Sequence, residues 1–354
     1  MSAAFVIVGA LSTIPIAFSN RVVESPHKRV GDPTVRTLVV ENMFFGTDVL
    51  RSKNVSRVWD GWDEACKASA ITNVAESDIG PLVYLLDLNV TFWVELGSFH
   101  GGSAIRTANV FKKLGLLDVT LLCVDTFLGS GAIHNDYQLG LYDSEGVPRI
   151  LDQFIDKIHS AGHDDIILAW PQTTMLAMHA LHDSFFSLRP VPRPDVIYLD
   201  SAHISRETLL ELELAWTLLP RGGILFGDDF SWESVSQDVM QFAMLYRESL
   251  DLNLVNDFSK ACQLGRRGCS AVQFVKPGLA VSFPSHQWIM RKNADPGYDK
   301  PSKELHALRG QFGNWATMDC FGVQGFSKDS CCGNGPPGNH KCWDVFFTFE
   351  KCCH

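Results

Sequence analysis

Residues 95–103 read ELGSFHGGS, a glycine-rich segment between the apolar run of residues 90–94 and the helical periodicity of residues 104–114. A strand, a glycine-rich turn and a helix in this order favour binding of a nucleotide-like ligand. Glycines let the backbone approach the ligand, and the helix N-terminus offers unpaired N–H groups. The next apolar run, residues 119–124, ends at Asp125, where a doubly wound sheet would hydrogen-bond a ribose. The alternative is a glycine-rich turn of the kind that any α/β protein can contain.

The rest of the central region alternates between strand and helix patterns. Its apolar runs are nearly continuous, which is typical of parallel strands buried on both faces. We expect strands at 91–96, 119–124, 165–169, 195–200 and 222–228, and helices at 103–114, 148–161, 174–187, 205–219 and 234–248. Residues 252–258 and 270–275 are expected to add a closing antiparallel pair. The pattern therefore predicts an α/β fold with a seven-stranded, mostly parallel sheet and helices on both faces.

Three carboxylates follow two of the predicted strands. Asp200 ends the fourth strand, and Asp228 and Asp229 end the fifth. Ligands of open α/β sheets bind at the carboxyl ends of the strands, so we expect these acids to lie together there. Carboxylates are the ligands that Mg²⁺ prefers, and a bound cation would lower the pKa of an acceptor hydroxyl. The alternative is that these acids cap the helices that follow.

The motifs at residues 95–103, 124–130, 199–203 and 222–229 occur in family order, and together they resemble the class I methyltransferases that use S-adenosylmethionine (SAM). Within that class they look like the macrocin O-methyltransferase type. The resemblance covers roughly residues 85–250. It implies a Rossmann-like sheet and SAM as the cofactor.

The resemblance also implies roles for individual residues. The cofactor-binding positions it marks are Glu95, Gly97, Ser98, Gly101, Ser103, Asp125 and Thr126. The metal-ligand positions are Asp200, Asp228 and Asp229. Some metal-dependent members carry a second acid two residues after the first Asp, but this chain has Ala202. His203 is then the nearest proton acceptor, since imidazole titrates near neutral pH.

The resemblance and the position of His203 together lead us to expect His203 and Asp200 as the catalytic residues. The alternative role of His203 is a structural hydrogen bond at the sheet end. Gln172 and Thr173 are placed to contact an adenine, and His134 and Asp136 to line an acceptor pocket.

The function expected is methyl transfer to a hydroxyl of a small polyhydroxylated acceptor such as a sugar, a glycoside or a catechol-like compound, with possible help from Mg²⁺. Two alternatives stay open: a hydroxylase or oxygenase on the same scaffold, and a secreted, non-catalytic interaction protein. The formal net charge of −10 over 354 residues argues against nucleic acid as a partner.

The N-terminal segment is apolar from residue 3 to residue 18, and a polar, basic stretch follows it. This suits a signal peptide over residues 1–19, although no Lys or Arg precedes the apolar run. An uncleaved membrane anchor or a buried first element are the alternatives. We expect a secretory location, with a cytoplasmic or membrane-anchored protein as the alternative.

The cysteines gather at the other end of the chain. The last 35 residues contain Cys320, Cys331, Cys332, Cys342, Cys352 and Cys353. We expect a small disulfide-linked module, and the alternative is a zinc site that includes His340 and His354. The predicted organisation is thus a cap segment at 30–88, a methyltransferase domain at 89–277, and an irregular linker with the cysteine-rich module at 278–354.

Overall fold

The computed structural model describes only part of the chain. The described residues are 33–52, 90–116, 118–129, 141–143, 145–201, 203–254, 256–257, 272–282, 286–293 and 332–333. The chain divides into two units, Met1–Pro33 and Thr34–His354, and every element below belongs to the second unit.

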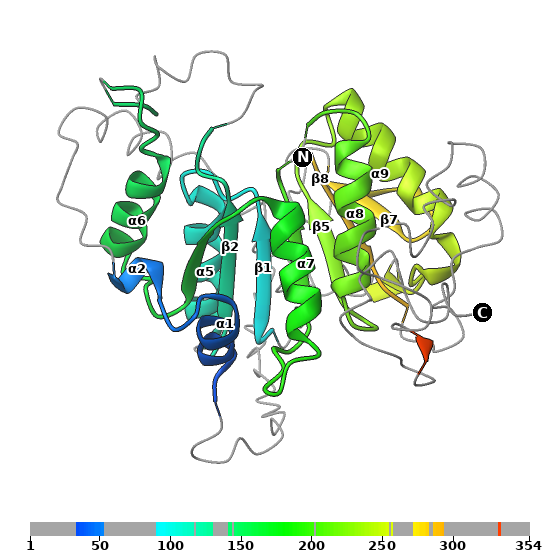
Figure 1. Cartoon of the computed structure of the whole chain (residues 1–354). Coiled ribbons are helices and arrows are strands. Elements are labelled where there is room, and N and C mark those ends of the chain that lie inside the picture. Colours follow the sequence, from blue (N-terminus) through cyan, green and yellow to red (C-terminus); the bar gives the residue numbers. More distant parts are fainter. Residues whose placement is uncertain are drawn as a thin grey trace, which may run out of the picture. The chain divides into compact units, whose positions relative to one another are not determined.

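A single sheet organises the second unit (Figure 1). Its described strands are β1 (Phe92–Leu96), β2 (Thr120–Asp125), β3 (Ile167–Pro171), β4 (Val196–Leu199), β5 (Ile224–Gly227), β6 (Val272–Lys276), β7 (Leu279–Ser282) and β8 (Gln287–Arg291). Their order in the sheet is β3-β2-β1-β4-β5-β8-β7-β6. The first five strands in this order are parallel, and β8, β7 and β6 pair antiparallel. The strand order reverses between β1 and β4, which is where ligands of doubly wound sheets bind.

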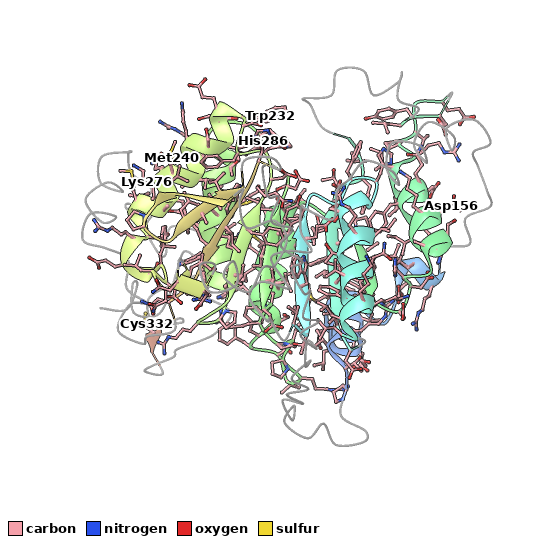
Figure 2. The ribbon with its side chains drawn as sticks, turned by 180° about the vertical axis from the view of Figure 1, so that it is seen from behind. Asp156, Trp232, Met240, Lys276, His286 and Cys332 are labelled. Atoms are coloured by element: carbon pink, nitrogen blue, oxygen red, sulfur yellow. The ribbon has the colours of Figure 1, made fainter. Side chains whose placement is uncertain are left out.

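Helices cover both faces of the sheet (Figure 1). The described helices are α1 (Val35–Met43), α2 (Val49–Ser52), α5 (Gly102–Leu114), α6 (Ile150–Ala161), α7 (Thr174–Ser184), α8 (Glu207–Leu218), α9 (Glu233–Leu245) and the short 3₁₀ helix η1 (Arg247–Ser249). One buried cluster joins α1, α7, α8 and α9 to one face, and a second joins α5 and α6 to the other. Side chains fill the layers on both sides (Figure 2).

Alternation along the strands separates the two clusters. Phe92, Val94 and Leu96 of β1 belong to the first cluster, whereas Trp93 belongs to the second. Both sets are fully or almost fully buried. The strands are therefore apolar throughout because each face lies under a helical layer.

The predicted α/β fold with a mostly parallel sheet is confirmed. All five predicted strand–helix units are present, with bounds that differ by at most three residues. Long apolar runs followed by helical periodicity identify such units well, while the ends of elements depend on local capping.

The antiparallel part of the sheet differs from the prediction. The structure contains eight described strands rather than seven, and β7 and β8 lie in a region predicted to be irregular. Pro277 and Gly278 looked like the start of a linker, but they form the turn between β6 and β7. Gly278 has φ +77°, the conformation that a Pro-Gly turn requires at its second position. The sheet thus continues to Arg291, past the boundary predicted at residue 277.

The predicted strand at residues 252–258 was wrong for the part that the structure describes. Residues 252 and 253 form a turn, and a short helical segment begins at residue 254. The N–H of Asn253 donates to the Asp251 carboxylate at 2.8 Å. Asp and Asn side chains favour this turn over a strand, because they bond their own backbone two residues on.

Several predictions lie outside the described residues and stay predictions. They concern the N-terminal signal or anchor, most of the cap segment, residues 130–140 with His134 and Asp136, and most of the cysteine-rich tail. Cys332 is disulfide-bonded, and its partner lies outside the described residues, since Cys123 is a free, buried thiol. No helix in the described part of the chain combines the length and the apolar character needed to cross a membrane.

Candidate active site at the carboxyl edge of the sheet

The glycine turn after β1 packs directly on the loop after β4. The N–H of Gly97 donates to the Val124 carbonyl at 2.8 Å. Gly97 has φ +89°, and a Cβ there would lie 2.7 Å from the Cα of Ser201 and closer still to the carbonyl oxygen of Asp200. Only glycine fits this position, because side-chain atoms do not approach backbone so closely. The expected reason for the glycine was close approach to a ligand, but the contact is with the protein itself.

The other two glycines of the turn differ from each other. A Cβ on Gly101 (φ +79°) would lie 2.9 Å from the ring of Phe154 on α6, so packing again requires glycine. A Cβ on Gly102 would meet nothing within 4 Å. Gly102 begins α5, whose N-terminus has no side-chain cap. The open approach to the turn is therefore at Gly102, beside the N–H groups at the start of α5.

Glu95 is a fully buried acid behind this turn. Its Oε1 accepts a hydrogen bond of 2.8 Å from the Ser103 hydroxyl. Burial raises the pKa of Glu95 to about 7, although the Ser103 and Ser98 hydroxyls and Arg106 act in the opposite direction. Oε2 is buried and makes no hydrogen bond of ordinary length and angle within the described structure. A buried carboxylate oxygen in this state is suited to accept a hydrogen bond from a ligand.

Asp125 holds the glycine turn in place. Its Oδ2 accepts the Phe99 N–H at 2.9 Å, and its Oδ1 accepts the Phe127 N–H at 2.6 Å. Burial raises the pKa of Asp125 above its ordinary value, while these backbone N–H groups oppose the rise. The Ser98 N–H and the Thr126 hydroxyl act on the same carboxylate. A carboxylate has about four acceptor positions, so a ribose hydroxyl would share or replace one of these contacts. The ribose contact stays a prediction beside this structural role.

The remaining predicted cofactor residues have local roles in the structure. Ser98 is almost fully buried, and the Thr126 hydroxyl accepts the Leu128 N–H at 3.3 Å. Gln172 donates its backbone N–H to the Asp125 carbonyl at 2.9 Å. Thr173 caps α7 by accepting the Leu176 N–H at 3.3 Å, a role that its hydroxyl suits.

The three predicted acids do lie at one edge of the sheet. The buried phenol of Tyr198 on β4 connects two of them, since its hydroxyl lies 3.2 Å from Asp200 Oδ2 and 3.4 Å from Asp228 Oδ2. Burial raises the pKa of Asp200 well above its ordinary value, and the nearby Asp228 and Asp229 carboxylates raise it further. Such a group of acids holds a proton or attracts a cation.

The backbone of the acid pair is held in an uncommon conformation. Asp229 has φ +58°, which is left-handed and rare outside glycine. Its N–H donates to Asp228 Oδ1 at 2.8 Å, and the next N–H, of Phe230, donates to the His286 carbonyl at 2.9 Å. The indole N–H of Trp288 on β8 donates to the Asp228 carbonyl at 3.1 Å. The unpredicted strand β8 thus supports the turn that carries the acids.

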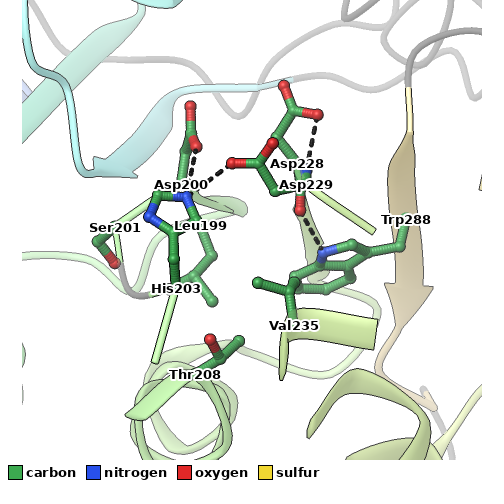
Figure 3. A pocket seen from close by; sticks show the side chains of 9 residues that line it. All are labelled: Leu199, Asp200, Ser201, His203, Thr208, Asp228, Asp229, Val235 and Trp288. Atoms are coloured by element: carbon green, nitrogen blue, oxygen red, sulfur yellow. Dashed lines mark hydrogen bonds and ion pairs between the residues drawn. The ribbon is translucent and has the colours of Figure 1, made fainter. Parts of the chain in front are cut away.

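His203 faces two of the acids (Figure 3). Its Nε2 lies 2.6 Å from Asp229 Oδ2 and 3.9 Å from Asp200 Oδ1. The Ser234 hydroxyl of α9 donates to the His203 carbonyl at 2.6 Å and fixes the loop. With Nε2 directed at Asp229, Nδ1 is the nitrogen that can take a proton from an acceptor.

The same groups can also hold a metal ion. Ligand atoms of Asp200, His203 and Asp229 all lie within 4.8 Å of one another. Asp228, the third predicted ligand, is not part of this group, because it faces Tyr198 and the Asp229 N–H. The pocket beside these residues has about 190 Å³ of empty space, part of which is open solvent. Its enclosed part is therefore small and suits a small group or an ion.

Sequence reasoning missed four residues of the site. Tyr198 was interpreted as an apolar strand residue, Trp288 lay in the region expected to be irregular, and Trp232 was not singled out. Glu211 on α8 is buried, and its carboxylate accepts hydrogen bonds from Ser201, at 2.8 Å, and from Thr174. The available signal for Glu211 was a charged residue among the apolar positions of a helix.

The comparisons with known proteins agree with this geometry. Residues 94–230 match the family model described as a methyltransferase domain. No curated protein matches the chain. The family match begins within β1 and ends directly after Asp229, so it contains every residue predicted to bind the cofactor or a metal.

Three solved structures are similar at low identity. A putative O-methyltransferase from Klebsiella pneumoniae is 15% identical, with 75% of this chain and 91% of that chain covered and a TM-score of 0.34. The O-methyltransferase from Bacillus cereus in complex with SAH is 12% identical, with 73% and 97% covered and a TM-score of 0.36. The O-methyltransferase TomG from Streptomyces achromogenes in complex with SAM is 13% identical, with 70% and 95% covered and a TM-score of 0.36.

The family match and the sheet agree on the same part of the chain. Residues 94–230, which carry the glycine turn, Asp125 and the acidic edge, are the part of the chain that is similar to a methyltransferase domain.

Proposed function

We propose that the chain is a SAM-dependent O-methyltransferase of the macrocin type. Its acceptor would be a small polyhydroxylated molecule such as a sugar, a glycoside or a catechol-like compound. The observation that carries the proposal is the packing of Gly97 on the backbone of Asp200 and Ser201. A cofactor on the glycine turn would then lie beside the acids and His203, which is the proximity that group transfer needs.

Residues of the turn are suited to hold SAM, which supplies a methyl group already activated by its sulfonium. Gly102 leaves space at the uncapped start of α5. The buried Oε2 of Glu95 makes no ordinary hydrogen bond to any described residue, so it offers an acceptor to a ligand. The Asp125 carboxylate would accept hydrogen bonds from the ribose hydroxyls.

His203 is proposed as the base that removes the acceptor proton. Asp229 lies 2.6 Å from its Nε2 and would keep the proton on that nitrogen. As the bond between the acceptor oxygen and the methyl carbon forms and the sulfonium bond breaks, the hydroxyl proton would pass to Nδ1. Asp200 would orient the acceptor by accepting a hydrogen bond from a second hydroxyl.

A metal-assisted form of this reaction is the second candidate. It rests on the ligand atoms of Asp200, His203 and Asp229, which lie within 4.8 Å of one another. Mg²⁺ would use the two carboxylates, whereas a nitrogen ligand favours transition metals. His203 would have different roles in the metal-free and the metal-assisted reaction. In the metal-assisted reaction its Nε2 would bind the cation and would no longer bond to Asp229.

The two alternatives from the sequence are less favoured. Non-haem iron oxygenases use two His and one carboxylate, and the group in the described structure has one His and two carboxylates. An interaction protein that binds its partner through the cysteine-rich tail would not require a buried acid, Glu95, behind the glycine turn. It would also not require Asp229 in a left-handed conformation after β5.

Calorimetric titration of SAM and of its demethylated product SAH tests the cofactor. We expect wild-type binding in the micromolar range. Glu95→Gln should weaken it by about tenfold or more, since a hydrogen bond to a charged group contributes about 1.5–3 kcal/mol. Glu41→Gln is the matched control, because Glu41 pairs with Arg189 on the protein surface, away from the glycine turn. Failure of the wild-type protein to bind either molecule would overturn the proposal.

A further inference from the structure

Trp232 stands at the edge of the site with much of its indole exposed. It immediately precedes α9, and 45% of its surface is accessible. Its ring centroid lies 4.8 Å from that of His203, with 39° between the ring planes. Figure 2 shows it at the surface next to His286. The proposed base thus has an exposed aromatic neighbour.

The position of Trp232 is fixed by the same turn that orients the acids. Its N–H donates to the Asp229 carbonyl at 2.8 Å, directly after the left-handed residue. Two residues further on, the Ser234 hydroxyl binds the His203 carbonyl at 2.6 Å. The indole, the imidazole and the Asp229 carboxylate are therefore held as one unit.

A single exposed apolar side chain needs no explanation, but a second one lies next to His203 in the sequence. Ile204 directly follows His203 and is 67% exposed. Two large, exposed apolar side chains therefore belong to a residue that contacts His203 and to a residue that directly follows it in the chain. The acids and His203 can bind hydroxyl groups, and the exposed indole of Trp232 offers an apolar surface for the body of an acceptor.

We propose that Trp232 is a specificity-determining residue that binds the flat face of a ring in the acceptor. Aromatic pairs and ring faces stack at centroid distances of about 4.5–7 Å. A ring on the exposed part of the indole would bring its hydroxyl toward His203. The inference rests on the proposed function and narrows its acceptor to a ring with a flat apolar face, either aromatic or a sugar.

Indole nitrogen NMR tests the contact directly. The protein is labelled with ¹⁵N-tryptophan and saturated with SAH, and Trp232→Phe identifies the Trp232 signal. Catechol, methyl glucoside and glycerol are then added separately at millimolar concentration. We expect the Trp232 signal to shift with catechol or with the glucoside but not with glycerol, and the ring that shifts it identifies the acceptor class.

Matched variants test the consequence for binding. Trp232→Ala should weaken binding of the active ring probe by about 3- to 10-fold, with SAH affinity unchanged. Met244→Ala is the control, because Met244 is 60% exposed near the other end of α9, twelve residues further along the chain. An unmoved Trp232 signal with every probe, or equal shifts with glycerol, would overturn the inference while SAH binding still stood. Absence of SAH binding would instead count against the proposed function.

Discussion

The backbone of Asp200 occupies the space that a side chain on Gly97 would need. A Cβ on Gly97 would lie 2.7 Å from the neighbouring Ser201 Cα and nearer still to the Asp200 carbonyl oxygen. The turn proposed to hold the cofactor and the loop proposed to hold the acceptor are therefore in direct backbone contact. Their spacing is determined by the sheet, because β1 and β4 are hydrogen-bonded neighbours.

Gly97→Ala should destabilise the protein by about 3–5 kcal/mol, because it adds a clash to an unfavourable φ. Gly46→Ala is the matched control. Gly46 has φ +85° with nothing within 4 Å of an added Cβ, so it should cost only about 1–2 kcal/mol. Urea denaturation of both variants measures the difference, and equal losses would contradict the close contact.

Glu95 should make stability fall as pH rises. Its folded pKa is about 7 against an ordinary value of 4.5, so the folded state holds the proton more tightly than the unfolded state. The stabilising contribution of Glu95 to the free energy of unfolding is fully present below pH 4.5. It is lost as the pH rises from 4.5 to 7, and stability then stays constant with respect to this group. Glu95→Gln should therefore be more stable than wild type by up to about 3 kcal/mol at pH 8 and nearly equal to it at pH 4.5. Denaturation at both pH values measures this, and a difference independent of pH would show that Glu95 is not the cause.

Asp125→Ala should destabilise the protein even without cofactor, by about 2–3 kcal/mol, because the Phe99 and Phe127 N–H groups lose their acceptor. Asp143→Ala is the control, since Asp143 also accepts two backbone N–H groups but lies in an exposed loop. We expect a smaller loss there. If Asp125→Ala unfolds at the same urea concentration as wild type, its bonds to the turn are not structural.

His203→Gln should lower kcat by about 100-fold or more if His203 is the base, with SAM affinity unchanged. His159→Gln is the control. His159 lies on α6, away from the acids, and it also pairs with an acid, Asp164. Methyl transfer is measured with and without EDTA, and we expect it to survive EDTA. Activity that EDTA abolishes and Mg²⁺ or Mn²⁺ restores would assign Asp200, His203 and Asp229 to a cation instead.

Trp288→Phe should affect both stability and activity, because it removes the N–H that binds the Asp228 carbonyl. The expected destabilisation is about 1–3 kcal/mol. Trp216→Phe is the matched control, since Trp216 is equally buried and donates to Ser249, away from the acids. We expect the two variants to be destabilised by similar amounts, and kcat to be lower only in Trp288→Phe. Equal kcat in the two variants would show that β8 does not support the acid pair.

The parallel half of the sheet was predictable because its signals are local. Apolar runs such as residues 196–199 and the helical periods that follow them depend on residues close together in the chain. Rules for doubly wound sheets then bring Asp200 and Asp228 to one edge. The antiparallel half was not predictable in the same way. A Pro-Gly pair such as Pro277-Gly278 is typical of both hairpin turns and linkers, and only the partner strand distinguishes them.

Sequence alone determined which residue types stand at the strand ends: a glycine turn, Asp125, three acids and His203. Only the tertiary structure decided how they meet. It directs His203 to Asp229 rather than to Asp228, puts Tyr198 between Asp200 and Asp228, and brings Trp288 to the acid pair from 60 residues further along the chain. These contacts join strands and loops that are distant in sequence, and their distances depend on register, backbone strain and packing, which no local pattern encodes.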